Sequence, residues 1–168
     1  AAKFTIVAAT GALSFLAVPD FETKLDVGTD NVYDVQVRAS DGANTTDQSI
    51  AVTVTAVNDN NPVFTSAATA NVAENTAAVL TVTATDADLP AQTVSYSIAG
   101  GADAAKFTIV AATGALSFVA APNFEVPTDI GTNNVYNVQV QAADGVGGAT
   151  TQNIAVTVTA VNDNNPAI

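Results

Sequence analysis

The sequence predicts an all-β protein composed of Greek-key β-sandwiches in tandem. Apolar and polar residues alternate with a period of two, which is typical of strands with one buried face. Asn, Asp, Gly and Pro interrupt these stretches at short intervals, as turns do. The chain also repeats itself, because residues 1–15 recur unchanged at 104–118 and residues 50–62 recur at 154–166. Repetition over the length of a domain indicates similar sandwiches that follow one another along the chain.

The repeated segment NDNNP gives the domain boundaries. If each boundary is placed at its Asn-Pro step, residues 62–165 form one complete repeat. Residues 1–61 are then the C-terminal part of a preceding repeat that is incomplete at its N-terminus, and residues 166–168 are the start of a next repeat. We therefore expect one whole sandwich and part of another.

Within the complete repeat, Val, Ile, Thr, Tyr and Phe fill the alternating stretches, and no stretch has a helical period. We expect about seven or eight strands, which suits a seven-stranded Greek-key sandwich. They are predicted near residues 63–66, 70–73, 79–85, 93–98, 106–110, 115–118, 135–140 and 154–161. The partial repeat is expected to hold strands near residues 3–7, 12–16, 32–39 and 48–57.

The composition excludes several classes of function. The chain has no Cys, His, Met or Trp, so it has no thiol nucleophile, no Cys/His zinc site and no Ser-His-Asp triad. Its 16 acidic and 4 basic residues give a net charge of -12, which repels nucleic acids and anionic membrane surfaces. Carboxylate oxygens are the ligands that Ca²⁺ prefers. We therefore expect a protein that is not an enzyme and that has calcium as its leading partner.

The acidic residues gather at strand ends and in loops. In the complete repeat they form an Ala-Glu-Asn, an Asp-Ala-Asp, an Asn-Phe-Glu, an Asp-Gly and a final Asn-Asp-Asn-Asn-Pro group. This order resembles a cadherin repeat, whose motifs are x-Glu-x, Asp-x-Asp, Asp-x-Glu, an Asp-Gly loop and the linker Asp-x-Asn-Asp-Asn-x-Pro. The resemblance covers the whole of residues 62–165 and implies that Ca²⁺ binds between consecutive repeats.

The resemblance also implies which residues are calcium ligands. The junction between the two repeats would use Asp20, Glu22, the Asn58 carbonyl, Asp59, Asn60, Asp86, Asp88 and Asp144. Half of the next junction would consist of Glu74, Glu125, Asn162, Asp163 and Asn164, and Asp41 would belong to the preceding junction. Six carboxylates at one junction repel one another unless cations neutralise them, and two or three ions would balance this charge.

Three positions depart from the family pattern. Ala56 and Ala160 stand where the linker of the family has Asp, and Asn123 replaces the Asp of the second Asp-x-Glu motif. Each change removes a carboxylate from a junction. These departures predict fewer or more weakly bound ions than in a typical member.

A simpler interpretation is available for each acidic group taken alone, since Asp and Asn commonly form turns and accept hydrogen bonds from nearby backbone amides. The other aspartates are expected to be solvated, namely Asp26, Asp30, Asp34, Asp47, Asp103 and Asp129. Lys3 and Lys106 each precede a strand Phe and are expected to extend along apolar surface towards water.

The features together predict an extracellular, cell-surface segment of a long bacterial adhesin or surface fibre, which acts as a structural spacer in cell adhesion. Its partners would be adjacent repeats of the same protein, and neighbouring copies if it forms a filament. Two alternatives stay open. In the first alternative, the chain is a filament protomer completed by strand donation from a neighbouring subunit. In the second, it is a module for glycan binding or homophilic adhesion.

Overall fold

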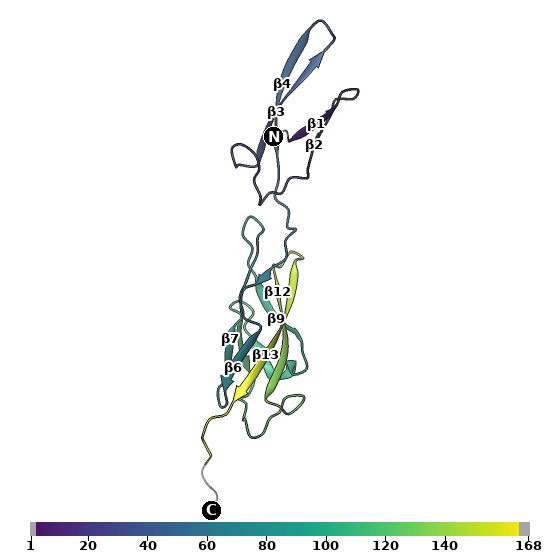
Figure 1. Cartoon of the computed structure of the whole chain (residues 1–168). Helices are drawn as coiled ribbons and strands as arrows, with labels where there is room; N and C mark the ends of the chain where they lie inside the picture. The colour runs from purple at the N-terminus through teal and green to yellow at the C-terminus, as the bar shows by residue number, and fades with distance from the viewer. Residues whose placement is uncertain (1–2, 165–168) are drawn as a thin grey trace, which may run out of the picture. The chain divides into compact units, whose positions relative to one another are not determined.

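The computed structural model describes residues 3–164, so the predicted domain end at 165 and the predicted next repeat at 166–168 lie outside the described residues. The predicted all-β class is confirmed: apart from one short 3-10 turn, η1 (Ala104–Lys106), the regular elements are strands. The chain divides into two compact units, Ala1–Val57 with Asp88–Pro90, and Asn58–Ala87 with Ala91–Ile168. Figure 1 labels most of the strands.

The first unit consists of two hairpins. Strand β1 (Phe4–Val7) pairs antiparallel with β2 (Ala12–Phe15), and β3 (Val32–Ser40) pairs with β4 (Thr45–Thr53). Phe4 and Phe15 face each other across the first hairpin, and their ring centroids are 4.5 Å apart. Tyr33 of β3 packs edge-on against Phe15 at 5.2 Å. An aromatic cluster therefore joins the two hairpins.

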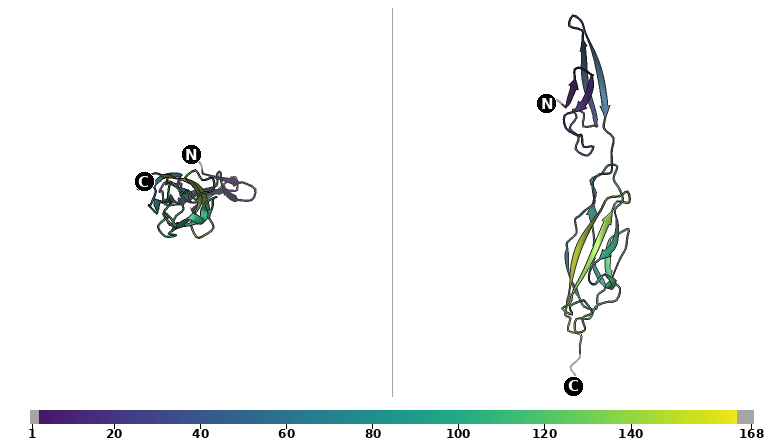
Figure 2. Two further views of the ribbon diagram at one scale, coloured as in Figure 1. Left: turned by 90° about the horizontal axis from the view of Figure 1, so that it is seen from below. Right: turned by 90° about the vertical axis from the view of Figure 1, so that its right-hand side faces the viewer.

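The second unit is a β-sandwich. One layer has the strand order β6-β13-β12-β9, in which β6 runs parallel to β13 and the other neighbours are antiparallel; the other layer is β10-β11-β7. Figure 2 shows the long strands β12 and β13 running along this unit. The bounds are β5 (Val63–Phe64), β6 (Thr69–Ala73), β7 (Ala78–Thr81), β8 (Ala84–Thr85), β9 (Ser95–Gly100), β10 (Phe107–Ile109), β11 (Ala115–Phe118), β12 (Val135–Ala143) and β13 (Ala149–Thr159).

The structure differs from the predicted strands at several ends. Strand β13 begins at Ala149 and not near residue 154, β9 covers Ser95–Gly100 and not 93–98, and β4 covers Thr45–Thr53 and not 48–57. Two further differences have a visible cause. The stretch 79–85, predicted as one strand, is divided into β7 and β8, because the Val82 N–H donates to the Gly114 carbonyl at 2.8 Å and Val82 itself is fully buried. Strand β13 ends at Thr159 and not near residue 161, since the Val161 N–H donates to the Glu74 side chain. Both differences come from contacts between segments that are distant in the sequence.

The core of the second unit follows the period-two pattern. Alternate residues of β12 and β13 are buried, and they meet Leu116 and two aromatic rings from the facing layer. The rings of Phe107 and Phe118 are stacked with their centroids 4.6 Å apart, and Tyr136 packs edge-on against Phe118 at 5.1 Å. The buried residues of the two strands are Tyr136, Val138, Val140, Ala142, Ile154, Val156 and Val158.

The variant Ile154→Ala is expected to destabilise the second unit by about 2–5 kcal/mol, because it removes three methyl or methylene carbons from a packed core. Ile50 occupies the matching position of the sequence repeat but is only half-buried, so Ile50→Ala should lower the free energy of unfolding by a smaller amount. Urea unfolding, followed by hydrogen exchange of peptides from each unit, measures both effects. Equal losses for the two variants would contradict the prediction.

Candidate metal centre

Three carboxylates meet at one end of the second unit. An oxygen of Glu74, one of Glu125 and one of Asp163 all lie within 4.8 Å of one another. The topology explains the meeting of two of them: β6 and β13 are parallel neighbours paired as far as Ala73 and Thr159, so the residues that follow both strands emerge at the same edge. Glu125 comes from the loop between β11 and β12. We call these three residues the distal acidic group.

Glu74 ties three segments of the second unit together. It is 2% exposed, and its Oε1 accepts the Val161 N–H at 2.7 Å while its Oε2 accepts the Phe124 N–H at 2.8 Å. Its own N–H donates to the Thr159 carbonyl at 2.9 Å. The two backbone donors, that of Val161 first, hold the pKa of Glu74 below its ordinary value of 4.5. Glu74 is therefore ionised at neutral pH and has a structural role even without a cation.

The linker that carries Asp163 is exposed at residues 162–164. Asp163 accepts the Asn75 Nδ2–H at 2.6 Å on Oδ2 and the Asn164 Nδ2–H at 3.1 Å on Oδ1. Asn162 is exposed beside it. The predicted roles of Asn162 and Asn164 as ligands stay predictions.

A second acidic pair lies in the same unit near the Asp-Gly loop. Asp144 follows β12 and has a carboxylate oxygen within 4.8 Å of one of Asp86. Its Oδ1 accepts the N–H groups of Val146, Gly147 and Gly148 at 2.7, 3.1 and 3.0 Å. Asp88 follows Asp86 by two residues and is 1% exposed. The structure thus brings Asp86 and Asp144 together, and their predicted role as calcium ligands stays a prediction.

The backbone around Asp144 forms a close cradle. The pKa of Asp144 lies below its ordinary value of 3.8, chiefly because the N–H of Val146 donates to the carboxylate. A side-chain hydrogen bond from Asn58 and the other loop amides lower this pKa further, whereas burial opposes them. A Cβ at Gly148 would overlap an Asp144 carboxylate oxygen. Gly148 therefore allows the loop to close on the carboxylate.

Two predicted ligands of the first unit, Asp20 and Asp41, form turns, whereas the Glu22 side chain accepts the N–H of Leu89 at 3.1 Å. Asp20 Oδ1 accepts the N–H of Glu22 at 2.9 Å and of Thr23 at 3.2 Å. Asp41 accepts the N–H of Ala43 at 2.9 Å and of Asn44 at 2.7 Å. These are the hydrogen bonds that the simpler, turn-forming interpretation expects. The joint junction set of Asp20, Glu22, Asn58, Asp59, Asn60, Asp86, Asp88 and Asp144 stays a prediction.

Three aspartates that the sequence analysis placed in solvent are buried, so that expectation was wrong for Asp26, Asp103 and Asp129. Asp129 accepts the N–H groups of Asn133 and Asn134 at 3.0 and 3.1 Å, and Asp26 does the same for Asp30 and Asn31. Asp103 binds the N–H of Ile130 and Asn137. A signal was present in the sequence, because the Asp-x-Gly-Thr-x-Asn pattern recurs at 26–31 and 129–134.

The chemistry of the distal acidic group suits a hard cation. All three side chains offer carboxylate oxygens, which favour Ca²⁺ or Mg²⁺. An ion pair joins Arg38 to Asp47 at 2.7 Å in the first unit, away from the distal acidic group. A bound divalent cation would offset the repulsion within each group.

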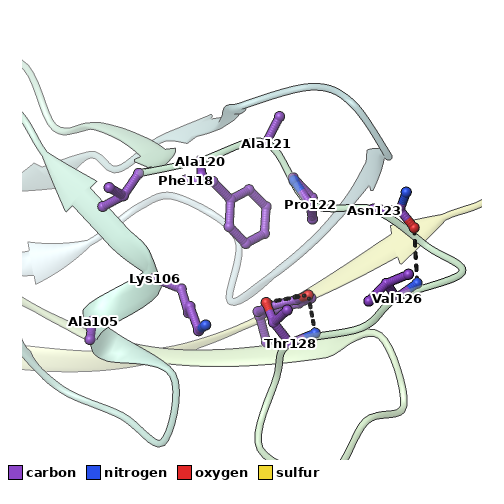
Figure 3. Close-up of a pocket in the computed structure, with 11 residues that line it drawn as sticks. Ala105, Lys106, Phe118, Ala120, Ala121, Pro122, Asn123, Val126 and Thr128 are labelled. Atoms are coloured by element: carbon purple, nitrogen blue, oxygen red, sulfur yellow. Dashed lines mark hydrogen bonds between the residues drawn. The ribbon is translucent and has the colours of Figure 1, made fainter.

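A cavity of 460 Å³ lies beside the loop that carries Glu125 (Figure 3). Phe118, Pro122, Val126 and Lys106 are among the residues that line it. Phe118 and Tyr136 are almost completely buried, so their ring faces are not available to stack on a sugar. This cavity gives no support to the glycan-binding alternative.

Acid is expected to destabilise the cation-free protein. The folded pKa values of Glu74 and Asp144 are lowered, so their contribution to stability is fully present above the ordinary values of 4.5 and 3.8. It is lost as the pH falls below these values and through the folded pKa of each group. Urea midpoints in EGTA, compared at about pH 7 and about pH 3, measure the loss. A midpoint that does not fall in acid would contradict it.

Comparisons with known proteins agree with this architecture. A family model described as "Cadherin domain" matches residues 68–160. Domains EC1-2 of human protocadherin-24 superpose with a TM-score of 0.72 and 22% identity, over 95% of this chain and 77% of that one. Drosophila N-cadherin EC1-4 gives a TM-score of 0.72 and 19% identity, over 92% of this chain and 39% of that one. Mouse cadherin-23 EC22-24 gives a TM-score of 0.65 and 27% identity, over 91% of this chain and 48% of that one.

These likenesses show the fold. The chain spans most of the first structure and less than half of the other two. No curated protein sequence matches the chain. Among the described residues, no helix has the length and apolar character needed to cross a membrane.

Proposed function

The chain belongs to the cadherin domain family, and from this premise we propose that it is a calcium-stiffened spacer segment of a long extracellular adhesion protein. Domains of this family are non-enzymatic, extracellular adhesion modules. We further propose a bacterial surface adhesin or fibre as the parent protein. Support comes from the identity of residues 1–15 and 104–118 and from the presence of only 4 basic residues.

The observation that carries the proposal is the position of the acidic groups in the second unit. Glu74 and Asp163 follow the parallel strands β6 and β13, at one end of the sheet. Asp144 follows β12, which is antiparallel to β13, and therefore lies at the opposite end. A module with carboxylates at both ends is suited to sharing cations with a neighbour on each side.

The proposed ligands follow from this arrangement and from the family motifs. Each group would bind Ca²⁺ together with residues of the adjacent repeat, so that the linker becomes stiff only when the cation is present. At the junction of the two repeats the proposed set is Asp20, Glu22, Asn58, Asp59, Asn60, Asp86, Asp88 and Asp144. Glu74, Glu125, Asn162, Asp163 and Asn164 would serve the next junction, and Asp41 the preceding one.

Calcium is expected to raise the unfolding temperature of the chain. A ligand that binds only the folded state stabilises it by about 2.7 kcal/mol at a hundredfold excess over Kd. Differential scanning calorimetry in Ca²⁺, in Mg²⁺ and in EGTA measures the effect and its selectivity. Identical melting curves in Ca²⁺ and EGTA would rule out the proposed function.

A matched pair of variants separates a defined site from general charge. Asp59→Asn and Asp34→Asn remove the same charge, but Asp59 lies in the linker and Asp34 is exposed on strand β3. We expect Asp59→Asn to weaken calcium binding and Asp34→Asn to leave it unchanged, as measured by isothermal titration calorimetry. Equal affinities for the two variants would show that net charge governs binding.

A further inference from the structure

Asn75 lies beside the distal acidic group without carrying a charge itself. It follows Glu74 at the end of β6, and its backbone has a left-handed conformation with a φ of 63°. Its N–H donates to the Pro122 carbonyl at 2.9 Å. Its side-chain Nδ2 donates to Asp163 Oδ2 at 2.6 Å. Asn75 thus contacts both the loop that carries Glu125 and the linker that carries Asp163.

The Asp163 side chain needs such a contact because it extends from an exposed part of the linker, beyond the hydrogen bond that holds Val161. It lies four residues beyond the end of β13 and is exposed. Its other carboxylate oxygen accepts a hydrogen bond from Asn164, the next residue, which belongs to the same linker. Among the hydrogen bonds of the described residues 3–164, the bond from Asn75 links Asp163 to the body of the sandwich. Without it, repulsion from Glu74 and Glu125 would favour outward positions of the Asp163 side chain.

We infer that Asn75 is a positioning residue that holds Asp163 against Glu74 and Glu125 before a cation binds. This inference rests on the proposed function and assigns a role to a residue outside its ligand set. An ionised carboxylate oxygen has more than one lone pair, so Asp163 can accept the amide N–H and still bind a cation. Hydrogen-bonding partners of metal ligands typically contribute 10–100-fold to metal affinity.

The backbone explains why an uncharged, short side chain occupies this position. A φ of 63° is unfavourable for most residues, whereas Asn and Gly adopt it readily. The left-handed turn directs the Asn75 amide back towards the linker that follows β13. Glycine preserves this conformation and removes the amide, so Asn75→Gly is the appropriate test variant. Thr132→Gly is a matched control, since exposed Thr132 also has a positive φ, of 51°, in the same unit.

The experiment is a double-mutant cycle measured by isothermal titration with Ca²⁺ on the full chain. It compares the parent, Asn75→Gly, Asp163→Asn, the double variant and the Thr132→Gly control. We expect Asn75→Gly to weaken one class of calcium sites about 10–100-fold and Thr132→Gly to have no effect. In the Asp163→Asn background, Asn75→Gly should cause no further loss, because the group that it positions has been changed.

A second readout does not depend on calcium affinity. In EGTA, the NMR signal of the Asp163 side-chain carboxyl carbon should shift in Asn75→Gly and remain in place in Thr132→Gly. An unchanged or tighter affinity for Asn75→Gly, or an equal loss in the Asp163→Asn background, would overturn the inference while leaving the proposed function intact. A parent chain that binds no calcium would overturn both.

Discussion

The variant Gly114→Ala is expected to destabilise the second unit by about 2–5 kcal/mol, the sum of left-handed strain and overpacking. Gly114 has a φ of 70°, and a Cβ there would overlap the carbonyl oxygen of fully buried Val82 and meet the Tyr96 ring at 3.3 Å. The Gly114 carbonyl also accepts the Val82 N–H. The two backbones cannot separate without loss of that hydrogen bond and of the packing of Val82.

Gly11 provides a control inside the same molecule. It lies in the identical 15-residue sequence and has nearly the same φ, 72°, but a Cβ there would meet nothing within 4 Å among the described residues. Gly11→Ala should therefore cost only the left-handed strain, about 1–2 kcal/mol. Hydrogen exchange of peptides from each unit under increasing urea distinguishes the two losses. If both variants lose equal stability, contact with Val82 is not the cause of the destabilisation in Gly114→Ala.

Glu74→Gln is expected to destabilise the second unit even in EGTA and, in addition, to remove most of its stabilisation by calcium. Both Glu74 carboxylate oxygens accept backbone N–H groups, those of Val161 and Phe124. A glutamine amide has one oxygen, so its NH₂ group must face a backbone donor and one part-buried N–H loses its acceptor. The variant should therefore unfold at a lower temperature and bind Ca²⁺ more weakly, as seen by calorimetry in EGTA and in Ca²⁺.

Glu125→Gln separates the two roles of the distal acidic group. It removes the same charge from the same group, but Glu125 is exposed on a loop. We expect Glu125→Gln to weaken calcium binding with little effect on the melting temperature in EGTA. If Glu74→Gln melts in EGTA at the same temperature as Glu125→Gln, the backbone hydrogen bonds of Glu74 do not stabilise the fold.

Part of the candidate site could be predicted from the sequence. Motifs identified Glu74, Asp86, Asp144 and Asp163, and the structure places them in two groups within one unit. The contribution of Asn75 was not predicted, because its effect depends on a hydrogen bond to a residue 88 positions later in the chain. The burial of Asp103 was missed for the same reason, since its partners Ile130 and Asn137 are distant in sequence.

Period-two alternation and turn residues act locally on the backbone, so they suffice to predict the all-β class and most strands. What each strand packs against depends on segments that are distant in the sequence. Residues 1–15 and 104–118 are identical, yet Phe15 is half-buried and Phe118 is 3% exposed. Local preferences form the same hairpin twice, whereas burial, the division of β7 from β8 and the meeting of the carboxylates depend on which distant segments lie against it.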